Sequence, residues 1–222
     1  MFDPKDFRAA LDPIVRIDGS LLYAEALCRP IGCTDLGLWF NEHHQAGRSS
    51  QIDLLMASMV SKLVCSLGVK CGINITPSTA IFHGEALLDN LGDQKTDVII
   101  EIVEWDSPCN YFDSRFLRFC QKAKVLGFSI MLDDVGSGSF IDPVVVQSIE
   151  ADGMKTHMNQ LKFALGLLKP DQELIIEYVE TKEMFNSLKH SGVTAYQGIY
   201  PRSINQQLGH HVQNDCTASI AL

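Results

Sequence analysis

The sequence predicts an α/β protein whose strands close into a (β/α)8 TIM-like barrel, and three observations support this fold class. Helical patterns alternate with strand patterns along the chain. In three places a glycine separates the end of a helical pattern from the strand that follows. The strand candidates are almost continuously apolar, as expected for a parallel sheet that is covered on both faces. A chain of 222 residues suits one such domain.

The first helix–glycine–strand unit is the clearest. Between positions 52 and 67, apolar side chains recur at the spacing of one helical face. They are Ile52, Leu55, Met56, Met59, Val60, Leu63, Val64 and Leu67. Gly68 can end this helix in a left-handed conformation, and residues 69–75 then have the composition of a strand.

Two further units repeat the pattern. A helical stripe over 116–126 is followed by Gly127 and by the strand candidate 128–132. A third helix is expected to begin after Thr181, a residue type that caps helix N-termini. It is expected to end at Gly192, before a strand over 193–196.

Five more segments complete the predicted barrel. The remaining strand candidates are 14–17, 21–27, 97–104, 151–154 and 173–179. Residues 30–50 are irregular, with room for one short helix. We expect a single barrel domain over residues 1–204, and a terminal helix or tail over residues 205–222.

Composition and charge exclude several classes of partner. The net charge is −9, from 27 acidic and 18 basic residues, and no basic run occurs. Binding to a long nucleic acid depends on phosphate neutralisation by Lys and Arg, so we expect no such partner. No apolar run is long enough to cross a membrane, and the N-terminus does not resemble a signal peptide. The seven cysteines lack the CxxC spacing of a zinc site, which favours reduced thiols and a cytoplasmic location.

Polar residues lie at or near the C-terminal ends of most predicted strands. They are Glu25, Asn74, Glu101, Asp133, Asp134, Lys155, Glu177 and Gln197. In a barrel these strand ends meet at one rim, where active sites of such barrels lie. Burial of unpaired carboxylates is costly, so a cationic partner is expected at the rim.

The charges of this set indicate what that partner is. Five carboxylates oppose one lysine, and two divalent ions would balance them. Ligation by oxygen atoms suits Mg²⁺ or Mn²⁺. Two such ions held by neighbouring carboxylates form the arrangement that hydrolyses phosphate esters.

Seven ordered segments, from position 11 to position 204, resemble those of one family. They are LDPIVRIDGSLLYAEALCR (11–29), GINITP (72–77), EIVE (101–104), LGFSIMLDDVGSG (126–138), ADGMK (151–155), IIEYVET (175–181) and YQGIYPRSI (196–204). They are similar to the motifs of the EAL domain family, the phosphodiesterases of the bacterial messenger cyclic di-GMP. The resemblance implies hydrolysis of cyclic di-GMP to linear pGpG by a two-metal mechanism.

The resemblance also implies a ligand set for two Mg²⁺ or Mn²⁺ ions. The residues that it implies for the first ion are Glu25, Asn74, Glu101 and Asp133. Those for the second ion are Asp133, Asp134 and Glu177.

Other roles follow from the same resemblance. Lys155 would orient or activate the attacking water, with Glu177 and Gln197 also in the catalytic set. Arg29 would bind a phosphate of the substrate, with Glu25 beside it. Glu104 would brace the loop after Asp134.

Three positions depart from the family pattern. His157 stands where the family has an aspartate two residues after the lysine, Tyr178 replaces a glycine, and Val135 replaces a phenylalanine. Two alternatives therefore stay open beside the enzyme. One is a catalytically silent regulator that acts through protein–protein contact, and the other is a cyclic di-GMP receptor without turnover. Family members also suggest a homodimer and control of motility or biofilm formation.

Overall fold

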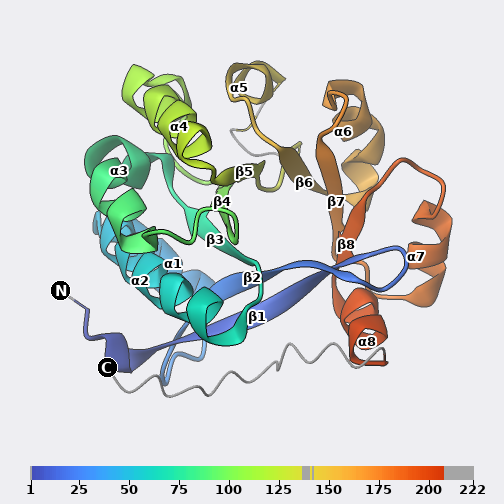
Figure 1. Ribbon diagram of the computed structural model, residues 1–222, viewed down its shortest axis with the longest axis horizontal. Helices are drawn as coiled ribbons and strands as arrows, with labels where there is room; N and C mark the ends of the chain where they lie inside the picture. The colour runs from blue at the N-terminus through green and yellow to red at the C-terminus, as the bar shows by residue number, and fades with distance from the viewer. Residues whose placement is uncertain (1, 137–140, 142, 208–222) are drawn as a thin grey trace.

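The computed structural model describes residues 2–136, 141 and 143–207, and its strands form one closed barrel in the order β1 to β8. The strands are β1 (Phe7–Arg16), β2 (Leu21–Pro30), β3 (Cys71–Ile75), β4 (Val98–Ile102), β5 (Ser129–Leu132), β6 (Gly153–His157), β7 (Glu173–Glu177) and β8 (Ala195–Gln197). The α-helices are α1 (Leu36–Gln45), α2 (Ser49–Leu67), α3 (Pro77–Leu91), α4 (Ser114–Leu126), α5 (Pro143–Ser148), α6 (Leu161–Leu167), α7 (Lys182–Leu188) and α8 (Ile199–Gln207). Helices surround the strands (Figure 1), which confirms the predicted fold class.

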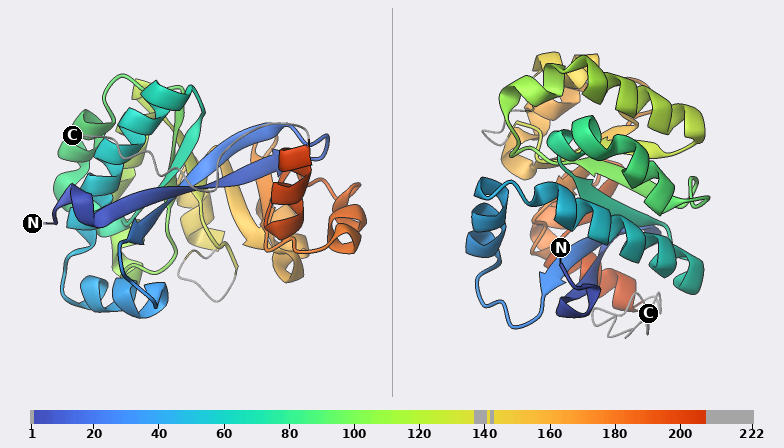
Figure 2. Two further views of the ribbon diagram at one scale, coloured as in Figure 1. Left: turned by 90° about the horizontal axis from the view of Figure 1, so that it is seen from below. Right: turned by 90° about the vertical axis from the view of Figure 1, so that its left-hand side faces the viewer.

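The first strand departs from the predicted parallel arrangement. Strands β2 to β8 are parallel to their sequence neighbours, but β1 pairs antiparallel with both β2 and β8. A tight turn containing Gly19, with φ of 85°, joins β1 to β2, so no crossover helix separates these two strands. The strand expected over 14–17 is therefore the end of a longer strand that runs the other way. Figure 2 shows β1 and β2 crossing the molecule as one long ribbon.

The predicted helices form where their capping residues indicated. Gly68 ends α2 and Gly127 ends α4, both in the left-handed conformation. The Thr181 side chain accepts a hydrogen bond from the Met184 backbone N–H and caps α7. Helix α7 ends at Leu188, earlier than the expected stop at Gly192. The irregular segment 30–50 contains one short helix, α1, as expected.

Two apolar layers make up the core. The larger lies between the strands and the helices, and α2 contributes Ile52, Met56, Val60 and Leu63 to it. Among the described residues, α2 alone is long and apolar enough to cross a membrane by length and composition. Its packing in this core identifies it as a core helix. The smaller layer lies inside the barrel.

The end of the chain falls largely outside the described residues. Helix α8 runs across position 204, where the barrel domain was expected to end, and residues 208–222 are not described. The expected helix or tail over 205–222 therefore stays a prediction. The six cysteines in the described part are free thiols, and Cys216 lies outside it.

Candidate metal centre at the barrel rim

The polar residues of the rim lie one layer above the apolar interior of the barrel. The interior layer consists of Ile14, Tyr23, Ile99, Met131, Ile175 and Ala195. Side chains alternate between the two faces of a strand, so the residue two positions away also points inward. In the parallel strands these residues are Glu25, Glu101, Asp133, Glu177 and Gln197. Gly72 and Gly153 occupy interior positions in the same way, two residues before Asn74 and Lys155.

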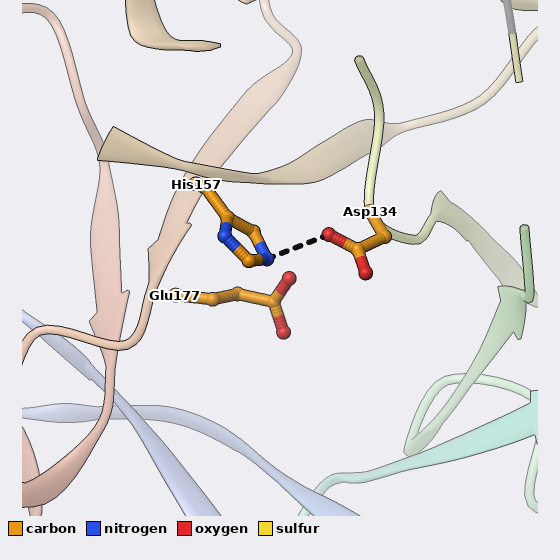
Figure 3. Close-up of side chains that lie close together, drawn as sticks. All are labelled: Asp134, His157 and Glu177. Carbon is orange, nitrogen blue, oxygen red and sulfur yellow. Dashed lines mark ion pairs between the residues drawn. The ribbon is translucent and has the colours of Figure 1, made fainter. Parts of the chain in front are cut away.

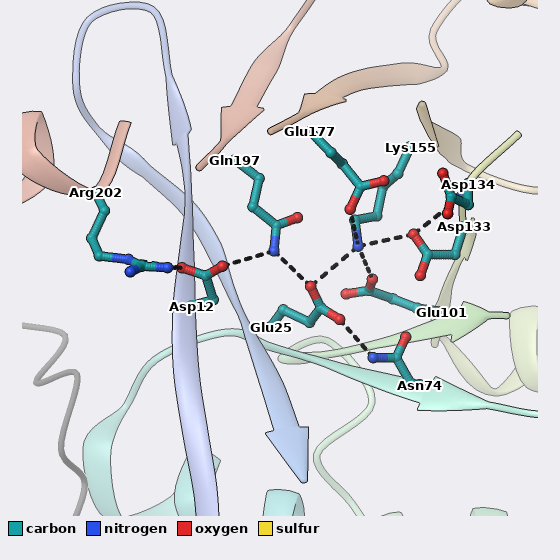
Figure 4. A network of polar contacts seen from close by, with 10 residues as sticks. All are labelled: Asp12, Glu25, Asn74, Glu101, Asp133, Asp134, Lys155, Glu177, Gln197 and Arg202. Carbon is teal, nitrogen blue, oxygen red and sulfur yellow. Dashed lines mark hydrogen bonds and ion pairs between the residues drawn. The ribbon is translucent and has the colours of Figure 1, made fainter. Parts of the chain in front are cut away.

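Lys155 lies at the centre of this rim (Figure 4). Its side chain is 1% exposed, and its Nζ lies 2.9 to 3.2 Å from oxygens of four carboxylates. These carboxylates belong to Glu25, Glu101, Asp133 and Glu177. One ammonium group thus faces four acids, and the centre lacks positive charge unless protons or cations are added.

Two amides hold Glu25 from the other side. Asn74 Nδ2 donates to Glu25 Oε1 at 2.6 Å, and Gln197 Nε2 donates to Glu25 Oε2 at 2.7 Å. Gln197 Nε2 also donates to Asp12 Oδ2 at 3.1 Å, and Arg202 donates two hydrogen bonds to Asp12. No role for Asp12 or Arg202 was predicted from the sequence.

The direction of β1 explains why Asp12 was missed. In the parallel strands the rim residue follows the interior residue by two positions, but in antiparallel β1 it precedes Ile14 by two. Asp12 therefore does not lie at the C-terminal end of its strand, where the other rim residues were predicted. The pairing of Asp12 with Glu25 in the β1–β2 register places it in the rim.

The pKa values of three rim carboxylates are raised, as expected where positive charge is lacking. Burial raises the pKa of Glu101 to about 8, even though Lys155 opposes this shift. Burial also raises the pKa of Asp133, and that of Glu177 well above its ordinary value. Burial acts in the same direction on Glu25, but Lys155 and the two amide donors outweigh it and lower its pKa. A divalent cation would displace the protons that these raised values retain.

Asp134, His157 and Glu177 form a second group beside this centre (Figure 3). His157 Nε2 lies 2.8 Å from Asp134 Oδ1. Asp134 has a φ of 51°, a left-handed conformation that lets its carboxylate turn toward the rim beside Asp133. The Tyr178 ring, also on a residue with positive φ, lies 4.6 Å from the His157 ring. Tyr178 is 58% exposed and does not fill the rim.

The residues present fit divalent metal ions. One ligand atom each from Glu25, Glu101 and Asp133 lies within 4.8 Å of the others, and the same holds for Asp134, His157 and Glu177. Glu101 Oε1 and Asn74 Oδ1 are buried without a hydrogen-bond partner. Such oxygen atoms are costly to bury unless a cation or donor satisfies them. The predicted ligands are thus brought together, and His157 joins them.

A cavity of about 530 Å³ opens above the rim. Arg29, at the end of β2, and Glu104, after β4, both line it. Burial raises the pKa of Glu104 to about 7. Its expected contact with the loop after Asp134 falls partly on residues 137–140, outside the described residues. The volume of this cavity lies within the range of about 300–1,000 Å³ that is usual for small-molecule sites.

Comparison by sequence gives no relative. Neither a protein-family model nor a curated protein sequence matches the chain.

Comparison by structure gives clear matches. An EAL domain protein from Listeria monocytogenes EGD-e has a TM-score of 0.74 at 18% identity, over 92% of this chain and 93% of that one. The PaMucR phosphodiesterase in complex with c-di-GMP has a TM-score of 0.72 at 16% identity, over 87% and 90%. Klebsiella pneumoniae BlrP1, in a calcium and cyclic di-GMP complex, has a TM-score of 0.70 at 19% identity. That match covers 89% of this chain but 56% of the BlrP1 chain, and a manganese complex of BlrP1 matches as well. The chain therefore has the barrel fold of EAL-domain proteins.

Proposed function

We propose that this protein belongs to the EAL family and hydrolyses cyclic di-GMP to linear pGpG with the help of divalent metal ions. The observation that carries the proposal is the convergence of four carboxylates on Lys155 at the rim of a barrel with this fold. The structurally similar PaMucR and BlrP1 are described as complexes with this dinucleotide, which supports the choice of substrate.

The residues of the rim divide into two ligand sets. Glu25, Asn74, Glu101 and Asp133 would hold one ion, and Asp134 and Glu177 would hold another, with Asp133 between them. When bound, such ions supply Lewis acidity toward phosphate oxygens and lower the pKa of water. Mg²⁺ and Mn²⁺ suit the oxygen-rich set.

The remaining rim residues would position the substrate and water. Four carboxylates surround the ammonium group of Lys155. Metal ions that bind these carboxylates would free it to orient a water molecule and to offset negative charge that develops during phosphoryl transfer. The amide of Gln197 must turn its Nε2 toward Glu25 and Asp12, since both are acceptors. Its buried Oε1, which has no hydrogen-bond partner, is left to accept from water or substrate.

Arg29 and Glu104 complete the proposed site from the walls of the cavity. Arg29 would bind a phosphate of the dinucleotide through its guanidinium group. Glu104 would support the segment after Asp134. The ribose and base portions of the dinucleotide would occupy the rest of the cavity.

A second candidate function is binding of cyclic di-GMP without turnover. The contact between His157 and Asp134 favours it, because a protonated His157 would compete with a metal ion for the Asp134 carboxylate. A silent regulator that contacts another protein would keep the same fold and lose both activities.

Further expectations accompany the proposal. Cyclic di-GMP is an intracellular messenger in bacteria, so we place the protein in the cytoplasm. We also expect a homodimer or a regulatory protein partner, and a role in motility or biofilm formation.

A chromatographic assay tests the proposed function. The purified protein is incubated with cyclic di-GMP and Mn²⁺ or Mg²⁺, and pGpG is quantified beside Glu25→Gln and His157→Asp variants. We expect turnover by the unmodified chain and its loss in Glu25→Gln. Turnover only in His157→Asp would favour the receptor, and no turnover in any of them would overturn the enzyme.

A further inference from the structure

The rim carries two ligand groups of different chemistry. The group of Glu25, Glu101 and Asp133 offers carboxylate oxygens, with the Asn74 oxygen beside them. The group of Asp134, His157 and Glu177 offers two carboxylates and one imidazole nitrogen. In the first group Glu25 and Glu101 are buried, whereas all three residues of the second are half-buried.

His157 is placed in the rim by the regular geometry of the sheet. It is the last residue of β6 and pairs with Glu177 in the parallel register between β6 and β7. Because side chains alternate along a strand, Lys155 and His157 both point toward the inside of the barrel. Figure 3 shows the imidazole with one ring nitrogen directed toward the carboxylates of Asp134 and Glu177.

The reactive nitrogen of His157 faces the group and is shielded from solvent. Its Nε2 has no hydrogen-bond partner, although Asp134 Oδ1 lies only 2.8 Å away. The Tyr178 ring packs against the imidazole, with the two ring centroids 4.6 Å apart. A buried nitrogen aimed at two carboxylates, without a hydrogen bond of its own, is arranged as a metal ligand.

From this geometry we infer that the Asp134–His157–Glu177 group is a mixed nitrogen–oxygen site for a first-row transition ion such as Zn²⁺ or Co²⁺. The inference deepens the proposed function and rests on it in taking the rim as a divalent-metal centre. Imidazole suits Zn²⁺, Co²⁺ and Ni²⁺, whereas Mg²⁺ takes oxygen ligands. Two carboxylates with a neutral imidazole also balance one divalent ion. The centre is therefore asymmetric, with an oxygen-ligated ion beside a nitrogen-ligated one.

The competing arrangement is an internal ion pair. In it, His157 carries a proton, donates to Asp134 and takes the place of the second ion. This arrangement leaves the all-oxygen site intact but gives no nitrogen ligand to any metal. The two arrangements differ in a property that can be measured without substrate.

Pulsed electron paramagnetic resonance on the metal-free protein reloaded with Mn²⁺ tests the nitrogen ligand. We expect a coupling between Mn²⁺ and an imidazole ¹⁴N nucleus in the unmodified protein. Labelling histidine with ¹⁵N should replace it with a ¹⁵N coupling. The coupling should be absent in His157→Asp, which keeps an oxygen ligand at that position. It should persist in His190→Asp, because His190 is exposed on the surface, and in Glu101→Gln, which alters the other group.

Calorimetric titration tests the metal preference. Mutation of a residue that only supports a metal ligand lowers metal affinity by about 10- to 100-fold, so loss of the ligand itself in His157→Ala should weaken Zn²⁺ binding at one of two sites by at least about tenfold. His157→Asp should weaken Zn²⁺ relative to Mg²⁺ at that site. A protein without nitrogen coupling, or with the same coupling in His157→Asp, would overturn the inference in favour of the internal ion pair.

The outcome is separable from that of the proposed function. Nitrogen coupling in a protein that never cleaves cyclic di-GMP would support the mixed site and reject the phosphodiesterase. Turnover without nitrogen coupling would do the reverse.

Discussion

Lys155 controls the balance of charge in the rim. Its ammonium group is buried, contacts four carboxylates, and has a pKa well above its ordinary value because those acids outweigh the effect of burial. Removing one partner from a buried ion pair leaves an uncompensated charge, which costs about 3–5 kcal/mol. The lysine is thus needed by the fold as well as by the proposed chemistry.

We predict that Lys155→Met lowers the free energy of unfolding of the metal-free protein by about 3–5 kcal/mol. A divalent ion should restore part of this loss, because it supplies the missing positive charge. Urea unfolding followed by circular dichroism measures both effects. Lys122→Met is the matched control, since Lys122 pairs with Glu85 on the exposed surface and should change stability by at most about 1 kcal/mol. An equally small effect in both variants would contradict the central role of Lys155.

Gly72 provides the space that Glu101 occupies. A Cβ atom at this position would lie 1.9 Å from Glu101 Oε1 and 2.7 Å from a carbon of the Tyr23 ring. Glu101 is buried and has no open solvent to move into. A side chain at position 72 would therefore force the Glu101 carboxylate out of its place in the rim. This close approach is the reason for a glycine at that point of β3.

We predict that Gly72→Ala weakens divalent-metal binding at the all-oxygen group by at least about tenfold, the size of effect found when a residue that positions a metal ligand is mutated. Isothermal titration with Mg²⁺ measures the effect. Gly166→Ala is the control, because nothing lies within 4 Å of the added Cβ in helix α6. Unchanged affinity in Gly72→Ala would show that Glu101 is not a ligand.

At the scale of elements, Asp53 connects helix α2 to the start of α3. Its carboxylate accepts hydrogen bonds from the Thr76 backbone N–H, the Thr76 hydroxyl and the Thr79 hydroxyl. Burial nevertheless raises the pKa of Asp53 from 3.8 to about 6. The folded protein therefore binds a proton at Asp53 in a pH range where the unfolded chain has released it.

The sign of the pH dependence follows from this shift. Between about pH 4 and pH 6 the folded state holds more protons at Asp53, so its contribution to stability falls as the pH rises. A shift of this size corresponds to about 3 kcal/mol. We predict that Asp53→Asn removes this part of the pH dependence, measured by urea unfolding at pH 4, 5, 6 and 7. The same slope in the variant and the unmodified protein would contradict the assignment to Asp53.

The strands also show what a sequence can and cannot predict. Strands β2 to β5 and β7 lie within or close to their predicted ranges, because parallel strands covered on both faces are apolar throughout. The eight rim residues named from the sequence all lie at the rim. The direction of β1 was not predicted, since the pairing of a strand depends on its tertiary neighbours. Asp12 and Arg202 were missed for that reason, as their contact joins β1 to α8.

The surroundings of His157 could be recognised only from the sequence and the structure together. The sequence showed a histidine where the family has an aspartate, but its spacing from Lys155 did not reveal which groups it would meet. Those groups come from β7 and from the segment after β5, and neither is a neighbour of His157 in the sequence. Only the closed barrel brings Asp134 and Glu177 to the same nitrogen.

In the barrel as a whole, one layer of residues contributes to stability and the layer above it provides the candidate binding site. The interior layer that includes Ile14, Ile99 and Ile175 is apolar and closes the bottom of the rim. The layer above it contains the buried charged residues Glu25, Glu101 and Lys155, and it opens into the cavity. A chain with net charge −9 can bind an anionic dinucleotide there only if metal ions reverse the local field.

Calorimetric titration of cyclic di-GMP into the purified protein, with and without a divalent ion, shows whether the rim is a metal centre that binds this dinucleotide. Ca²⁺ serves as the ion, and the metal-free protein in chelator is the reference. We predict one dinucleotide per chain in the presence of the ion and a loss of affinity without it, because the ion supplies the positive charge that the phosphates require. Glu101→Gln should behave like the metal-free protein. Binding that is equally tight with and without the ion, or no binding of either metal or dinucleotide, would contradict a metal centre for cyclic di-GMP at this rim.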